Sequence, residues 1–197
     1  AFLPLFHTNA QSYSMLGSLW VGGTIVVQPR FSASRFWPTA RKYKCTWTSL
    51  IPFCVKALLS QDPPPDHSFR FWNPAIRMID VETTYGIPTF GWWGMTETIT
   101  HGIVGDIDHP GESMSIGRVS PGYDIEVRDP HGNFIKPGER GLLYIRGVRG
   151  VSLFKEYFKN PEANENAFDD DGWFETGDYI IMGENGDLYF GDREKDM

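Results

Sequence analysis

The segment with the clearest capacity for chemistry is residues 91–98, Gly-Trp-Trp-Gly-Met-Thr-Glu-Thr. The glycine at position 94 lets the backbone approach a ligand closely, and Trp93 beside it offers a flat face for a purine ring. Thr96 supplies a hydroxyl donor, and Glu97 supplies the hard carboxylate oxygen that Mg²⁺ prefers. On residue types alone, the alternative is a buried aromatic turn that carries one surface acid.

Two later segments carry further candidate groups. Residues 171–178, Asp-Gly-Trp-Phe-Glu-Thr-Gly-Asp, end in Asp178, whose carboxylate can accept hydrogen bonds from two vicinal ribose hydroxyls at once. Residues 191–197 contain Arg193, a fixed fork of donors, and Lys195, a flexible point charge. The alternatives are an aspartate that caps a turn and a solvated loop of mixed charge.

The first half of the chain must position the segment at 91–98. Helical and strand patterns alternate there, which predicts an α/β fold with a mainly parallel sheet and flanking helices. Because open sheets of this kind bind ligands beyond the carboxyl ends of their strands, residues 91–98 are expected at that edge. The expected elements are helices at 11–20, after Ser32 or Ser34, and at 52–59, and strands at 24–27, 46–50 and 89–92.

The second half has a different texture. Short alternating runs separated by Pro-Gly and Asp/Asn-Gly turns predict a small β-rich subdomain with strands at 123–128, 141–146, 179–182 and 188–190, and a short helix from Pro161 to Phe168. The predicted organisation is therefore an α/β part at 1–115, a β-rich subdomain at 116–191 and a hinge at 192–197.

The three segments, in this order, resemble the adenylate-forming superfamily of acyl-CoA synthetases, firefly luciferase and nonribosomal peptide synthetase adenylation domains. Residues 91–97 are similar to the family's Y-G-M-T-E signature, with Trp93 in place of the tyrosine. Residues 171–178 are similar to G-W-x-x-T-G-D, and residues 191–197 to the family's hinge segment. Residues 3–7, Leu-Pro-Leu-Phe-His, resemble its P-x-F-H segment.

That resemblance implies roles for individual residues. Trp92, Trp93, Gly94 and Met95 would line the nucleotide site, with Trp93 stacked near adenine. Thr96 would contact the α-phosphate, and Glu97 would bind Mg²⁺. Asp178 would hold the ribose with help from Arg193. His7 would lie between the acyl and nucleotide pockets, unless it is simply a histidine satisfied at a strand end. Lys195 would be the hinge for a C-terminal domain.

The resemblance also implies an activity. The protein would be an ATP-dependent acyl-CoA ligase, with ATP/AMP and Mg²⁺ at the site and a carboxylic acid and coenzyme A as substrates. Residues 98–100 and 153–158 look most similar to bacterial crotonobetaine/carnitine-CoA ligases. A glycine-rich phosphate loop is expected before Phe2 and a lysine-bearing domain after Met197. Two alternatives stay open: transfer to carrier-protein phosphopantetheine, and a non-catalytic nucleotide-binding module.

Composition narrows the partners. The formal charge of −7 argues against nucleic-acid binding, which needs a surplus of Lys and Arg on one face. No apolar run approaches the roughly 18 residues of a membrane span. Cys45 and Cys54 lack the C-x-x-C spacing and are expected to be reduced, which favours a cytoplasmic protein. A homo-oligomer is compatible with the sequence.

Overall fold

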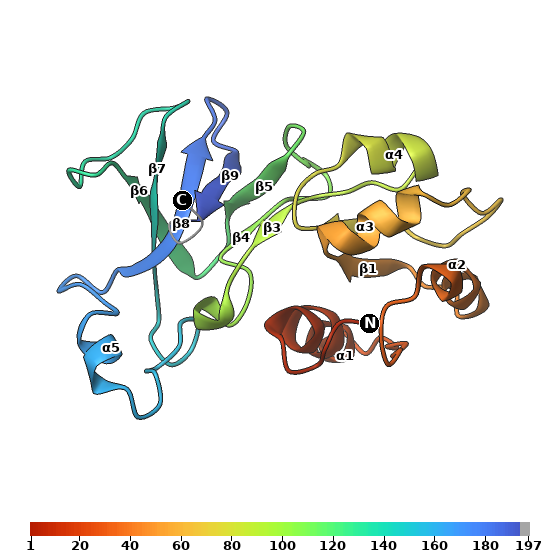
Figure 1. The fold of residues 1–197 in the computed structure, drawn as a ribbon, viewed down its shortest axis with the longest axis horizontal. Coiled ribbons are helices and arrows are strands. Elements are labelled where there is room, and N and C mark those ends of the chain that lie inside the picture. The colour runs from red at the N-terminus through yellow and green to blue at the C-terminus, as the bar shows by residue number, and fades with distance from the viewer. Residues whose placement is uncertain (194–197) are drawn as a thin grey trace.

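The first half of the chain folds into helices around a short parallel sheet (Figure 1). In the computed structural model, which describes residues 1–193, β1 (Trp47–Leu50) pairs in parallel with β2 (Phe71–Pro74). Thr89 adds an isolated parallel bridge to Trp72. The helices of this part are η1 (Asn9–Leu16, a π-helix), α1 (Gly17–Trp20), α2 (Ala33–Lys42), α3 (Pro52–Leu59) and α4 (Ile79–Tyr85).

Local chemistry explains where α3 begins but not where α2 begins. Pro52 stands in the first turn of α3, where its missing N–H costs no hydrogen bond, and the predicted bounds of 52–59 are confirmed. Ser32 is the N-cap residue of α2, but its side chain makes no capping hydrogen bond. Its hydroxyl lies 3.2 Å from the Ser34 hydroxyl instead. The predicted first helix at 11–20 begins earlier, at Asn9, and changes from π to α geometry at Gly17.

The predicted strand at 24–27 is wrong. This segment belongs to no strand, although its backbone bonds to the first residue of the chain: the Ala1 amino group donates to Val26 O, and Gln28 N donates to Ala1 O. A cavity, described below, lies between this segment and β1. A β-branched run needs a neighbouring strand at hydrogen-bond distance, and local sequence does not reveal whether one is there.

Aromatic side chains dominate the core of the helix-rich part. Rings of α2, β2 and α4 pack together, including Phe36 against Trp72 with ring centroids 5.6 Å apart and Trp37 against Tyr85 at 5.1 Å. Each large ring buries 150–250 Å² in typical cores, so a few of them fill the space between these elements. This core contains the buried side chains of Phe2, Phe36, Trp37, Ala40, Leu50, Cys54, Val55, Leu58, Phe69, Trp72, Val81, Tyr85 and Ile87.

The rest of the chain forms a seven-stranded antiparallel sheet with its own core. Its strands are β3 (Trp92–Trp93), β4 (Ile103–Val104), β5 (Ser115–Val119), β6 (Tyr123–Arg128), β7 (Arg140–Gly147), β8 (Phe174–Met182) and β9 (Leu188–Arg193). They are arranged in the order β3-β4-β5-β9-β8-β7-β6. The four strands predicted in this half are confirmed as β6, β7, β8 and β9, although β8 begins at Phe174 and not at 179, and β5 was not predicted. The short helix α5 (Pro161–Glu165) ends before the predicted Phe168.

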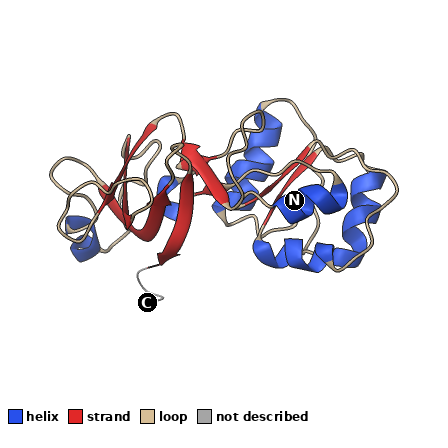
Figure 2. Ribbon diagram, turned by 90° about the horizontal axis from the view of Figure 1, so that it is seen from above, coloured by secondary structure: helices blue, strands red, loops and turns tan. Residues whose placement is uncertain are grey.

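The chain passes from one sheet to the other just before the signature segment. Thr89 bridges to the parallel sheet, whereas Trp92 already pairs with Val104 in the antiparallel sheet. The predicted single strand at 89–92 is therefore wrong. Figure 2 shows the helix-rich and sheet-rich parts as two groups of elements, and β3 of the signature segment lies between them (Figure 1). The antiparallel sheet begins at Trp92, earlier than the change of texture near residue 116. The division of domains at 115/116 stays a prediction.

Candidate active site

Asp178 is the most enclosed acid among the predicted site residues. Its side chain is 2% exposed, and each carboxylate oxygen accepts one hydrogen bond from a distant part of the chain. Trp93 Nε1 donates to Oδ2 at 2.8 Å, and Arg193 Nε donates to Oδ1 at 2.9 Å. The structure thus brings together one predicted residue from each of the three candidate segments.

The strand geometry explains why Asp178 and Arg193 meet. The two residues are direct partners in the antiparallel β8–β9 pair, where opposite charges attract across the ladder. Gly177, immediately before Asp178, has φ +72°, a left-handed conformation that favours glycine, and the ladder registers of β8 shift on both sides of it. Gly177 therefore permits the backbone geometry that places Asp178 opposite Arg193.

Trp93 lies inside the second core. It is 5% exposed, and its ring packs so closely against Gly102 that a Cβ there would lie 3.0 Å from it. Its backbone pairs with Ile103 of β4, which fixes the direction of the side chain. The sequence pattern anticipated a flat face for adenine but not the indole N–H bond to Asp178. Stacking of Trp93 on adenine stays a prediction.

Trp92 points toward a separate aromatic cluster. Its indole Nε1 donates to Asn73 O at 3.2 Å, and its ring lies 5.5 Å from Tyr13 and 5.3 Å from His101. Tyr13 and His101 are closer still, with ring centroids 3.6 Å apart. Burial lowers the pKa of His101 to about 4, because an imidazolium loses its hydration there. The cluster joins η1 of the helix-rich part to the loop after the signature.

Thr96 and Glu97 form the one-turn helix η2 (Thr96–Thr98), with Thr96 exposed and Glu97 half-buried. Tyr157 Oη donates to Glu97 Oε1 at 2.9 Å, and Phe154 N donates to Glu97 O at 2.8 Å. Burial, followed by this contact with the carboxylate, raises the pKa of Tyr157 to about 12. Residues 153–158 therefore support Glu97 from outside its own segment.

Tyr157 is the functional candidate that the sequence analysis missed. The run that contains it was noted only for its likeness to a subfamily, and nothing local to it indicates a partner 60 residues earlier. The one tyrosine of the run Leu-Phe-Lys-Glu-Tyr-Phe is the signal that could have pointed to a contact, because a tyrosine can pack its ring and donate a hydrogen bond through its hydroxyl.

Gly94 and Met95 are held by local packing. A Cβ at Gly94 would lie 2.7 Å from both Thr100 O and Tyr13 Oη, so the glycine permits close approach of the protein itself. Met95 N donates to Thr98 Oγ1 at 3.0 Å, and the Met95 side chain packs against the second core. A direct contact of either residue with a nucleotide stays a prediction.

His7 makes no contact with the other predicted site residues among the described residues. His7 is exposed just before η1, where its ring lies 4.5 Å from the Phe6 ring. Lys195 lies outside the described residues. Their predicted roles, at the acyl pocket and at the hinge, stay predictions.

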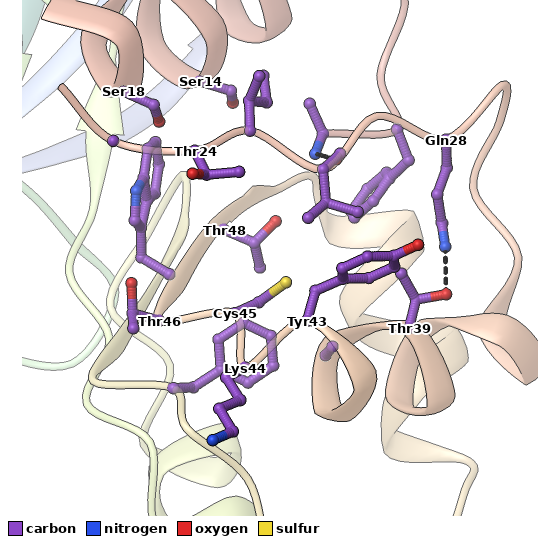
Figure 3. Close-up of a pocket in the computed structure, with 18 of the residues that line it drawn as sticks. Ser14, Ser18, Thr24, Gln28, Thr39, Tyr43, Lys44, Cys45, Thr46 and Thr48 are labelled. Carbon is purple, nitrogen blue, oxygen red and sulfur yellow. Dashed lines mark hydrogen bonds between the residues drawn. The ribbon is translucent and has the colours of Figure 1, made fainter.

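A cavity of about 510 Å³ lies elsewhere, in the helix-rich part (Figure 3). Ser14 and Ser18 line one side of it, the extended segment with Thr24 another, and Thr48 of β1 the opposite side. Gln28 Nε2 donates to Thr39 Oγ1 at 2.7 Å across its rim. None of the predicted site residues lines this cavity, so it is distinct from the site around Asp178 and Glu97.

Comparison with known proteins shows the family to which this chain belongs. A family model described as "AMP-binding enzyme" matches residues 1–158. The chain belongs to the AMP-binding enzyme family. The crotonobetaine/carnitine–CoA ligases of Salmonella arizonae and Escherichia coli O139:H28 are each 36% identical to it over 206 aligned positions, which cover 99% of this chain. The chain spans 39% of the length of these relatives.

Solved structures of similar enzymes share the fold. O-succinylbenzoate coenzyme A synthetase from Bacillus subtilis, solved with AMP, is 28% identical and superposes with a TM-score of 0.83, covering 100% of this chain and 51% of that chain. A benzoate CoA ligase from Burkholderia xenovorans LB400 has a TM-score of 0.85 at 24% identity, covering 97% of this chain and 40% of that chain, and supports the fold alone. The predicted α/β fold is confirmed.

Two expectations about the whole chain have structural counterparts. Cys45 and Cys54 are both free thiols, as predicted, and burial raises the pKa of each. Among residues 1–193, no helix is long and apolar enough to cross a membrane.

Proposed function

We propose that the protein containing this chain is an ATP-dependent acyl-CoA ligase whose nucleotide site is built around Asp178 and Glu97. The observation that carries the proposal is the convergence of Trp93, Asp178 and Arg193, which come from three separate segments and meet within hydrogen-bond distance. A buried carboxylate with a guanidinium beside it is suited to the hydroxyls of a ribose. Family membership supports ATP as the nucleotide.

Glu97 fits the part of a magnesium ligand. Mg²⁺ is usually bound by one or two carboxylates together with substrate phosphates and water. Across the described residues there is no cluster of three or more His, Cys, Asp or Glu that could hold a metal ion by itself, which favours that mode of binding. The bond from Tyr157 holds one oxygen of Glu97. A bound Mg²⁺ would supply charge neutralisation for the phosphates.

The chemistry follows in two steps. A carboxylate oxygen of the acid attacks the α-phosphorus of ATP, and the bond to the bridging oxygen breaks, releasing pyrophosphate and leaving an acyl-adenylate. The coenzyme A thiolate then attacks the acyl carbon, and AMP leaves with the electron pair of the broken C–O bond. The protein contributes chiefly by positioning and by fixed donors, with Thr96 proposed at the α-phosphate.

The proposal names the chemical class of the acyl acceptor and of the carboxylic acid substrate. Coenzyme A is proposed because the similar proteins are named as CoA ligases, including those for crotonobetaine/carnitine. For this chain we propose a small-molecule carboxylic acid, with His7 near the acyl group and Lys195 at the hinge. A cytoplasmic location, consistent with the free thiols, is part of the same proposal.

The deciding experiment is carboxylate-dependent exchange between ATP and pyrophosphate, measured on the full-length protein. The acids range from acetate through medium-chain acids to carnitine, with and without Mg²⁺. Magnesium-dependent exchange with any acid, followed by CoA thioester formation, is the expected result. Exchange without thioester formation would redirect the proposal to a carrier-protein acceptor. ATP binding with no exchange for any acid would support a non-catalytic nucleotide-binding module.

A further inference from the structure

The carboxylate of Asp178 is held at both oxygens before any ligand arrives. Trp93 Nε1 and Arg193 Nε each donate to a different oxygen, at 2.8 and 2.9 Å. An ionised carboxylate has about four acceptor positions, so two protein donors leave lone pairs for two hydroxyls. The directions of those remaining lone pairs depend on the rotamer in which the two donors fix the group.

The two donors differ in how firmly they can do this. Arg193 is 53% exposed at its side chain and is the last residue of β9. The indole of Trp93 is 5% exposed, stands on β3 opposite Ile103, and can only donate. If this deeply buried indole N–H lost its acceptor, the full free-energy cost of its desolvation would remain uncompensated. Trp93 is therefore the rigid partner of Asp178.

This donor is specific to the chain's own sequence at the signature. The family that residues 91–97 resemble has tyrosine where this chain has Trp93, and a phenol ring has no N–H at the corresponding edge. The contact also spans 85 residues and joins β3 to β8, which are separated by β4, β5 and β9 in the strand order of the sheet. It thus couples the position of the signature strand to that of the carboxylate.

We infer that Trp93 is a positioning residue that orients the Asp178 carboxylate and thereby makes the site selective for ribonucleotides over deoxyribonucleotides. The inference rests on the proposed function, since it takes the ribose of ATP as the partner of Asp178. It assigns to Trp93 a polar role that stacking on adenine does not include. A stacking residue would affect ATP and its deoxy analogues equally.

The test is equilibrium binding of ATP, 2′-deoxy-ATP and 3′-deoxy-ATP to the full-length protein and its variants. The wild type should prefer ATP to at least one deoxy analogue, and Asp178→Asn should abolish most of that preference. In Trp93→Phe, the ratio of the deoxy-ATP dissociation constant to the ATP dissociation constant should fall roughly three- to tenfold, the usual net effect of losing one hydrogen bond. An equal loss of affinity for all three nucleotides would overturn the inference.

Two further proteins separate the N–H group from ring volume. Replacing Trp93 with β-(3-benzothienyl)alanine keeps the fused ring and exchanges the N–H for sulfur, so the ratio should narrow as in Trp93→Phe even if that variant folds poorly. Trp37→Phe is the matched control: Trp37 is 6% exposed in the other core, and its N–H has no hydrogen-bond partner within the described residues. This control should leave the ratio unchanged.

The outcomes also separate this inference from the proposed function. A wild-type protein that binds no ATP would overturn both. A wild-type protein that binds ATP and discriminates against a deoxy analogue, with the ratio intact in both Trp93 variants, would overturn only the positioning role. A wild type that binds ATP without discriminating would likewise leave the ligase proposal standing and remove the role of Trp93.

Discussion

The two carboxylates of the candidate site are held in opposite ways. Asp178 is buried, with both oxygens bonded to donors that come from other segments. Glu97 is half-buried on a single helical turn, and one of its oxygens accepts a bond from Tyr157. The proposed roles fit this difference: a ribose ligand benefits from being fixed in advance, whereas a ligand of a metal ion carried with ATP has to stay open to solvent.

The comparison predicts that the two acids contribute to different properties. Asp178 should matter for both the stability of the fold and the affinity for the nucleotide, because its removal leaves the buried N–H of Trp93 without an acceptor. Glu97 should matter for turnover with little effect on stability. Of the four experiments below, three test that separation and one tests the effect of burial at His101; they are given from the largest expected effect to the smallest.

Glu97→Gln should reduce magnesium-dependent adenylation by roughly 100-fold or more, since the neutral amide loses the charge that a metal ion needs. The melting temperature should stay within about a degree of the wild type, because the amide still accepts the bond from Tyr157. Pyrophosphate exchange and a thermal melt measure the two quantities. Glu165→Gln, on the exposed face of α5, is the control. Unchanged turnover would remove Glu97 from the mechanism.

Like Asp178, His101 is enclosed by the protein. Its lowered pKa should make the free energy of unfolding depend on pH. Burial lowers its pKa to about 4, against 6.5 for a free histidine. As pH falls from about 6.5 to 4, the unfolded chain takes up a proton that the folded one refuses, so stability decreases by up to about 3 kcal/mol across that window. Urea unfolding at several pH values should show this decrease, and His101→Gln should flatten it.

The exposed His131 provides the matched control for that experiment. His131→Gln should keep the wild-type dependence of the unfolding free energy on pH. A His101→Gln protein with the same dependence as the wild type would show that the imidazole is hydrated in solution, and the enclosed cluster around Trp92 would have to be more open than the structure has it.

Asp178→Ala should lower the free energy of unfolding by about 1–3 kcal/mol, the usual cost of an unsatisfied buried donor, here the Trp93 N–H. Chemical denaturation measures this change. Asp124→Ala is the control, because the Asp124–Arg146 ion pair is exposed and such pairs contribute little. If the Asp178→Ala and Asp124→Ala proteins were equally stable, the buried hydrogen bonds of Asp178 would not contribute to the stability of the fold.

Tyr157→Phe should reduce adenylation about three- to tenfold and raise the Mg²⁺ concentration needed for half-maximal rate, since Glu97 loses one orienting hydrogen bond. Stability should change little at a half-exposed position. Tyr144→Phe is a matched control, because Tyr144 Oη makes the same kind of bond to Glu175, at 2.6 Å, away from the signature. A loss of rate in both variants would indicate a general effect of removing a hydroxyl.

Much of the fold was predictable from the sequence because its signals are local. The turn residues and alternating runs of the second half predicted the four strands that the structure contains, and Pro52 marked the start of α3. The strand at 24–27 failed because β-branched residues indicate extended backbone without indicating a partner, and there a cavity replaces the neighbouring strand. The change from the parallel to the antiparallel sheet between Thr89 and Trp92 could not be predicted for the same reason, because it depends on which strands pair.

By itself, the sequence determined which groups are available for chemistry: Trp93, Glu97, Asp178 and Arg193, in an order that resembles one enzyme family. The tertiary structure decided which of them meet. Trp93 and Asp178 are 85 residues apart, and Tyr157 and Glu97 are 60 apart, so their hydrogen bonds depend on strand order and not on any local pattern. Side-chain type is a property of one position, whereas the burial that gives a contact its strength comes from the packing of distant segments.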